Sequence, residues 1–203
     1  QMIIDTKFFS KLSVSSELEA LLLEAKLVKN YQTKYNSALR DDKHPIYIKI
    51  TDEKYPRVLT ARKQDAQFLG PFPATTNVNS VLKLLRRIFP FSKHKLGKRG
   101  CLYSQIGLCN PCPNEIEKEK NAKIKAQLLQ EYRRNIKYIK AILSGRFSFV
   151  RNSLVSLMNE YSREENFEMA KLTRNQIAQL DYITQPVIPI GDYCKPKTIL
   201  LRL

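Results

Sequence analysis

The sequence predicts a mainly helical α+β protein with a buried core and no membrane span, and three observations indicate this. Apolar residues recur at helical spacing in several long stretches, whereas only two short segments have the composition of strands. The length of 203 residues and a hydrophobic fraction of 43% suffice for a buried core. No apolar run approaches the ~18–20 residues of a membrane span, and no signal segment opens the chain. We therefore expect a soluble cytoplasmic protein.

The N-terminal half should combine helices with two strands. We expect a first helix that is capped by Ser15 or Ser16, carries its apolar residues over 18–28 and closes near Lys29–Asn30. A polar loop over 35–43, strands over 46–50 and 57–60 joined at 52–54, an interruption of regular structure at 70–73 and a helix over 78–88 should follow.

The C-terminal half should be helical. We expect one long helix over 115–143 that ends at Ser144–Gly145, then a helical hairpin of 149–163 and 167–183, then an extended tail. These elements divide the chain into five expected regions. They are a first region over 1–65 with a helix and the strands, a basic cysteine-containing region over 66–114, a long linking helix over 115–148, a helical hairpin over 149–183 and a tail over 184–203.

Charge points to a polyanionic partner. Thirty-five Lys and Arg against 19 Asp and Glu leave a net charge of +16, and residues 66–114 hold seven cations and no acid. Nucleic acid is favoured over a membrane surface, and no small-molecule substrate is indicated; a merely soluble surface is the alternative. The candidate DNA contacts are Lys29, Lys34, Arg40, Lys43, Arg86, Arg87, Lys95 and Arg99.

Glu24 is the first candidate site residue. Its helical neighbours three and four positions away are all apolar, namely Ala20, Leu21, Leu27 and Val28. A carboxylate in such a ring should be partly buried with a partner or face a cleft. It could form a salt bridge to a distant basic residue, or act as a metal ligand or acid–base group.

A group of cysteines is the second candidate. Cys101, Cys109 and Cys112 are spaced C-x7-C-x2-C, and His94 lies seven residues before Cys101. Three thiolates and an imidazole supply the four ligands of a closed zinc or iron–sulfur site, in a reducing compartment. The alternative is a compact loop with free cysteines. Cys194 is isolated and is expected to be a free thiol.

Apolar stripes run along both helices of the expected hairpin. They could form core within this chain, or dock on another surface because two short helices bury little area alone. The stripes comprise Val150, Leu154, Leu157, Met158 and Tyr161 on the first helix, and Phe167, Ala170, Thr173, Ile177 and Leu180 on the second.

Several motifs in the same order resemble the excinuclease C family, which forms part of the bacterial excinuclease ABC and belongs to the GIY-YIG endonuclease superfamily. They are Glu17–Tyr31, Lys34-Tyr35-Asn36, residues 39–43 (LRDDK), 47–51 (YIKIT), Pro56-Arg57, Phe68–Phe72 and residues 101–112 (CLYSQIGLCNPC). The hairpin resembles a UVR motif, with Tyr161-Ser162 in place of the usual paired alanines.

The resemblance implies a role for each candidate. Glu24 would hold the single Mg²⁺ or Mn²⁺ of a partial GIY-YIG nuclease domain, and the cysteines a [4Fe–4S] cluster, with His94 where the family has a further cysteine. The hairpin would dock on excinuclease B, the helicase-like component of the same enzyme. The implied docking residues are Leu154, Met158, Phe167, Glu168, Ala170, Arg174, Ile177 and Leu180.

The implied function is incision of DNA beside lesions in nucleotide excision repair. The family's GIY and YIG tyrosine segments and its catalytic arginine precede the glutamate helix and do not occur in this sequence, which opens with Gln1. We therefore expect an N-terminally incomplete homologue that does not cleave DNA as it stands. The alternatives are a catalytically inactive adaptor and a basic RNA-binding protein unrelated to repair.

Overall fold

The computed structural model describes residues 4, 7–8, 11–14, 16–31, 46–62, 68–72, 75–97 and 100–184. It is a mainly helical α+β fold, as predicted. Its elements are α2 Glu17–Tyr31, β1 Ile46–Ile50, β2 Val58–Ala61, β3 Phe68–Phe72, α4 Thr75–Ile88, α5 Leu102–Gln105, α6 Pro113–Lys118, α7 Ala122–Leu143, α8 Phe147–Arg163 and α9 Phe167–Thr184. The predicted loop at 35–43 and the tail lie outside the described residues.

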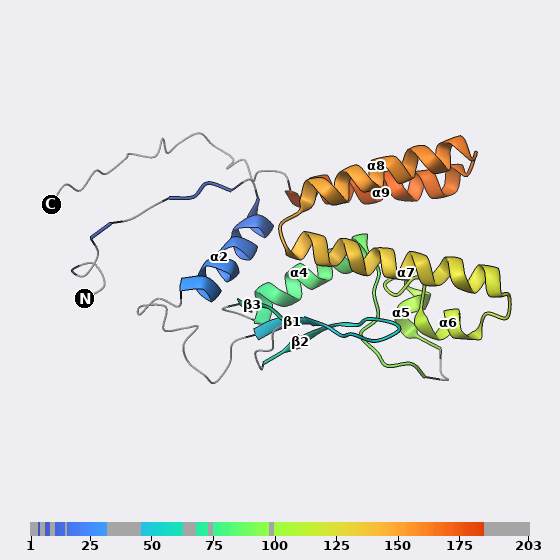
Figure 1. Ribbon diagram of the computed structural model, residues 1–203, viewed down its shortest axis with the longest axis horizontal. Coiled ribbons are helices and arrows are strands. Elements are labelled where there is room, and N and C mark those ends of the chain that lie inside the picture. The colour runs from blue at the N-terminus through green and yellow to red at the C-terminus, as the bar shows by residue number, and fades with distance from the viewer. Residues whose placement is uncertain are drawn as a thin grey trace.

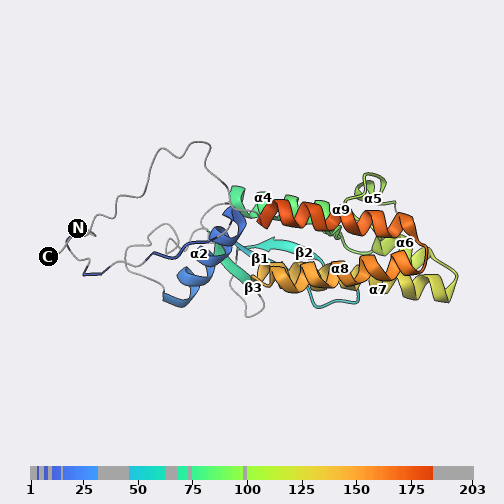
Figure 2. The ribbon, with the colours of Figure 1, turned by 90° about the horizontal axis from the view of Figure 1, so that it is seen from above.

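The elements form layers (Figure 1). An antiparallel sheet of order β2-β1-β3 lies beneath α4 and α7. The α8–α9 hairpin covers these helices from the other side, with α8 on α7 and α9 on α4 (Figure 2). Helix α2 packs against β3 and α9. A continuous core, including Ile48, Leu82, Leu85, Ile139, Leu154 and Leu180, joins these layers.

Helix α2 begins as the sequence predicts. The Ser16 hydroxyl accepts a hydrogen bond from the Glu19 N–H at 3.2 Å, which satisfies one of the free donors of the first turn. Leu18, Leu22 and Ala25 form its buried face. The helix extends to Tyr31, slightly beyond the predicted end.

The predicted interruption of regular structure at residues 70–73 is wrong, because strand β3 runs through this segment to Phe72. Among the described residues this strand pairs only with β1, so it is an edge strand, and an edge strand tolerates the missing N–H of Pro71. Between the Ile46–Phe72 and Ile48–Leu69 pairs, β3 carries one extra residue. Gly70 lies in this bulge at φ +136°, where an added Cβ would stand 2.9 Å from the Ile46 carbonyl oxygen.

The predicted single helix over 115–143 is also wrong, because it is two helices. Glu119 and Asn121 are extended, and the Asn121 side chain accepts from the N–H groups of Lys123 and Ile124, capping α7. Tyr132, Ile136 and Ile139 form an apolar stripe on α7 and are buried.

Helix α7 is fixed to the sheet layer through Tyr132. This fully buried residue donates its hydroxyl to the Pro56 carbonyl at 2.6 Å and accepts from the Ser92 N–H at 3.4 Å. These bonds hold the segment after α4 beside the β1–β2 hairpin. No helix in the described parts of the chain is long and apolar enough to cross a bilayer.

Candidate metal centre

Four predicted ligands converge beside α5 and α6. One donor atom from each of His94, Cys101, Cys109 and Cys112 lies within 4.8 Å of every other. The His94 Nε2 stands 3.9 Å from the Cys109 Sγ and 3.8 Å from the Cys112 Sγ. All three cysteines are buried and His94 is half-buried. The group can therefore bind a metal.

Backbone hydrogen bonds shape the segment that carries the cysteines. Cys101 precedes the short helix α5, and the N–H groups of Leu108 and Cys109 both donate to the Tyr103 carbonyl, at 2.9 and 3.1 Å. Gly107 allows this reversal with φ +73°. The chain then reaches Cys112 immediately before α6, which starts with Pro113. Cys109 is thereby folded back between the other two cysteines.

Polar contacts aim His94 at the thiols. The Ser92 hydroxyl donates to the His94 carbonyl at 3.0 Å, and the His94 Nδ1 lies 2.8 Å from the Lys95 carbonyl oxygen. The Gly97 N–H donates to the Asn114 side chain at 3.0 Å, which joins the histidine segment to α6. The imidazole is therefore held on one edge while Nε2 faces sulfur.

Burial dominates the electrostatics of the thiols. It raises the pKa of Cys109, and the nearby Cys112 and Cys101 sulfurs raise it further. Burial also raises the pKa of Cys112, against backbone N–H groups of Asn114 and Glu115 that favour its thiolate. Such N–H groups stabilise a ligating sulfur when a metal is bound.

Arg86 supports this site and does not face solvent, so its prediction as a DNA contact is wrong. Its side chain is buried, its Nε donates to the Leu108 carbonyl at 2.8 Å, and its guanidinium lies 4.1 Å from the centre of the Tyr103 ring. Its Nη2 is buried without a hydrogen-bond partner in the described structure. Leu108 directly precedes Cys109, so Arg86 anchors the cysteine segment to α4.

Sequence reasoning also missed Asn135, a second anchor of this segment. Asn135 lies buried on α7, and its amide contacts the carbonyls of Pro90 at 3.3 Å and Asn110 at 3.4 Å. It lies three residues after Tyr132 and four before Ile139, which are both buried, and this spacing is the signal that indicates burial. The segment is thus held from both α4 and α7.

Of the other predicted DNA contacts, Arg87 and Lys95 are exposed. Lys34, Arg40, Lys43 and Arg99 lie outside the described residues, and the side chain of Lys29 is not described. For these cations, DNA binding stays a prediction.

Glu24 is exposed, so the expectation that it is partly buried or faces a cleft is wrong. The buried face of α2 follows Leu18, Leu22 and Ala25, and the apolar neighbours of Glu24 are only half-buried or exposed. Within the described parts of the chain no ion pair reaches Glu24, so the predicted salt bridge is not found there.

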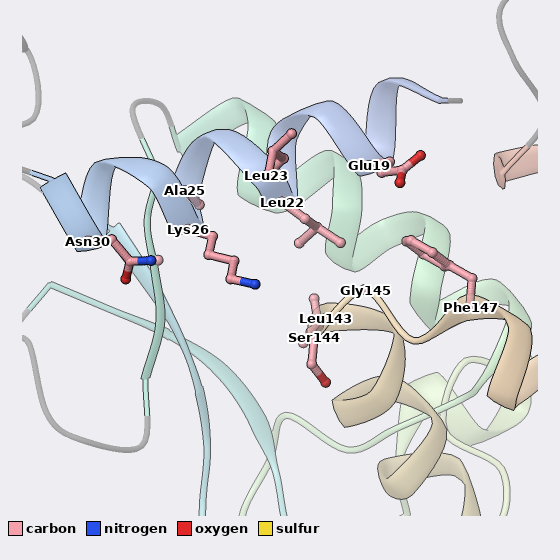
Figure 3. A pocket seen from close by; sticks show the side chains of 11 residues that line it. Glu19, Leu22, Leu23, Ala25, Lys26, Asn30, Leu143, Ser144, Gly145 and Phe147 are labelled. Carbon is pink, nitrogen blue, oxygen red and sulfur yellow. The ribbon is translucent and has the colours of Figure 1, made fainter. Parts of the chain in front are cut away.

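A cavity of about 530 Å³ opens on another face of α2, toward the α7–α8 turn. Figure 3 shows Lys26 extending from α2 on the side of Leu143 and Ser144, with Leu22 between the two elements. Glu19 and Lys26 are seven residues apart on the helix, about 10 Å along its axis. The polar groups of this cavity therefore do not form a compact set.

The hairpin residues divide into two sets. Leu154, Ile177 and Leu180 are buried in the core of this chain, as the intramolecular interpretation predicts. The Gln176 side chain also donates to the Ile88 carbonyl at 2.9 Å, which fastens α9 to α4. By contrast, Phe167 is 67% exposed at the start of α9. Of the other predicted docking residues, Glu168 and Arg174 are exposed and Met158 and Ala170 half-buried.

Comparison with protein-family models gives two matches. Residues 45–131 match the middle domain of the UvrC/Cho excinucleases. Residues 150–183 match the UvrB/UvrC motif, called UVR. The first match contains all four candidate ligands, and the second covers the α8–α9 hairpin. No solved structure matches the chain.

Proposed function

We propose that this chain, which belongs to the UvrC/Cho excinuclease family, binds DNA and the helicase-like excinuclease B during incision in nucleotide excision repair. A role in that repair pathway follows from its UvrC-type middle domain and UVR motif. The observation that carries the proposal is the presence of both matched regions on one chain, packed through a common core. This arrangement suits a protein that holds a partner at one end and DNA at another.

The exposed start of α9 is the proposed contact with excinuclease B. Phe167 exposes 67% of its surface, and it is flanked by the exposed Glu168. Exposed aromatic residues are frequent anchors in protein interfaces. Leu154, Ile177 and Leu180 would then act indirectly, by holding the hairpin on α4 and α7.

The proposed DNA contact is electrostatic. The net charge is +16, and Arg87 and Lys95 are exposed in the acid-free segment 66–114. Phosphate-dominated binding has little sequence preference and falls steeply with salt. The same charge would also suit RNA, so damaged duplex must be compared with structured RNA.

Incision would use Glu24 as one ligand of a Mg²⁺ or Mn²⁺ ion, which polarises a scissile phosphate when bound. A second candidate function is that of a catalytically inactive adaptor. The exposed and solitary position of Glu24 among the described residues favours the adaptor. A nicking assay with either ion, with and without excinuclease B, distinguishes the two functions once an upstream GIY-YIG segment is joined to the chain.

Binding measurements test the proposal. Fluorescence anisotropy with damaged duplex should give a log–log salt slope of roughly −0.9 for each phosphate neutralised. Calorimetry with the C-terminal hairpin of excinuclease B should detect a complex. Tight binding to structured RNA, with none to duplex or to excinuclease B, would overturn the proposed function.

A further inference from the structure

We infer that His94, Cys101, Cys109 and Cys112 form a tetrahedral centre for a single metal ion of the zinc class, and not the ligand set of a [4Fe–4S] cluster. The ligand atoms are close enough for one ion, because all four lie within 4.8 Å of one another. This inference concerns the chemistry of the chain itself and does not depend on the proposed role in repair.

Distances between ligand atoms separate the two kinds of site. Zinc bonds of 2.0–2.1 Å to nitrogen and 2.3 Å to sulfur, in a tetrahedron, place nitrogen about 3.5 Å from sulfur and two sulfurs about 3.8 Å apart. The His94 Nε2 lies 3.9 and 3.8 Å from two of the sulfurs. In a cubane cluster each ligand binds a different iron atom, so the ligand atoms stand farther apart. The observed spacing therefore fits one ion and not the cluster.

The hydrogen bond at Nδ1 of His94 agrees with a ligand role for Nε2. Nδ1 lies 2.8 Å from the Lys95 carbonyl oxygen, which can only accept a hydrogen bond. The proton of a neutral imidazole therefore belongs on Nδ1, and the Nε2 lone pair is free to bind a metal. A backbone carbonyl in this position is the usual orienting partner of a metal-binding histidine.

The surroundings indicate a structural centre. Four protein ligands complete a tetrahedron and leave no open position for water or substrate. Cys109 and Cys112 are fully buried, and Arg86 and Asn135 hold the same segment from two helices. A metal at this point would fix residues 92–97 and 100–112 against α4 and α7.

Metal analysis of the whole chain tests the inference. Protein purified with and without oxygen should contain about one zinc per chain and lack the broad visible absorption of iron–sulfur clusters. Replacement by Co²⁺ should give the intense visible bands of tetrahedral coordination by sulfur and nitrogen. Protein prepared without oxygen that holds about four iron and four sulfide per chain would overturn the inference. So would metal-free protein whose three thiols are freely alkylated.

Substitution of the histidine tests its ligand role separately. His94→Ala should weaken zinc binding by more than about 100-fold, which exceeds the 10–100-fold typical for loss of an orienting partner. His94→Cys should retain zinc and shift the Co²⁺ bands toward those of four-sulfur coordination. His44→Ala, at the other histidine of the sequence, is the matched control and should change nothing. An unaltered Co²⁺ spectrum in His94→Ala would refute ligation by His94.

Discussion

The glutamate helix and the cysteine segment both carry candidate ligands in the sequence, and the structure treats them differently. Glu24 stands exposed on α2, whereas four residues spread from position 94 to 112 meet within 4.8 Å. The apolar neighbours of a single residue do not show whether its side chain is buried, because the whole helix decides which of its faces packs on the core. Several residues of compatible chemistry constrain one another, and their convergence is a stronger prediction. Substitutions in each region test this contrast.

Loss of a cysteine ligand should have the largest effect. Cys109→Ser should abolish metal retention and lower the free energy of unfolding by at least ~3 kcal/mol, because structural zinc contributes about 10–16 kcal/mol of binding in small zinc-dependent folds. Metal analysis and chemical denaturation measure the two effects. Cys194→Ser is the matched control and should behave like the unmodified chain. Equal stability of both variants would show that the converged group is not a metal centre.

Two substitutions in α9 compare its buried and exposed apolar residues. Leu180→Ala should destabilise the fold by about 2–5 kcal/mol, the usual result of truncating a buried leucine. Phe167→Ala should change stability by less than about 0.5 kcal/mol and weaken binding to the excinuclease B hairpin by about 2–4 kcal/mol. Thermal unfolding and calorimetry measure these effects. Unchanged affinity in Phe167→Ala would remove Phe167 from the interface.

Adjacent arginines make a closer comparison. Arg86→Met should destabilise the cysteine segment by ~1–2 kcal/mol, because the Leu108 carbonyl loses its buried donor. Arg87→Met should leave stability unchanged and make the salt slope of DNA binding shallower by roughly 0.9. Denaturation and salt titrations separate the two roles. The reverse outcome, with Arg86→Met affecting only DNA binding, would contradict the assigned burial.

The spacing of apolar residues along α4 indicates which of the two arginines is buried. Arg86 lies four residues after Leu82 and three before Phe89, which are both buried, whereas the residues three and four before Arg87 are exposed. Both arginines were predicted to contact DNA because they lie in the acid-free segment 66–114, and this charge pattern does not distinguish a buried arginine from an exposed one. Apolar periodicity correctly predicted helices α2 and α4 and the α8–α9 hairpin for a similar reason, since each depends on neighbouring residues.

Other features depended on partners distant in the sequence. Strand β3 exists because β1 offers it a free edge, and the segment around Gly70 and Pro71 shows no strand signal of its own. The anchoring of the cysteine segment by Asn135 spans 25 residues and cannot be read from spacing. Only the division between α6 and α7 had a local signal, the capping residue Asn121.

Acid should weaken the contact between the β1–β2 hairpin and α6. The Glu117 carboxylate accepts hydrogen bonds from Lys125 at 2.7 Å, Lys54 at 2.6 Å and Tyr55 at 2.9 Å, and these bonds lower its pKa from 4.5 to about 2. A lowered pKa stabilises the fold above the unfolded value, and this stabilisation is lost as pH falls from 4.5 toward 2. Denaturation across this range should therefore show a slope that Glu117→Gln reduces. Identical profiles would exclude the contribution of Glu117.

The smallest effect is expected at Glu24. Its side chain is exposed, and no described cation pairs with it, so Glu24→Ala should change the free energy of unfolding by less than about 0.5 kcal/mol. Zinc content and duplex affinity should also stay unchanged, because the cysteine group and the exposed cations lie elsewhere. A role in incision would therefore appear only as lost metal-dependent nicking, measured after an upstream GIY-YIG segment is joined to the chain. Nicking that survives Glu24→Ala would end the assignment of Glu24 as a metal ligand, whereas absence of nicking by the extended chain with Glu24 intact would favour the adaptor.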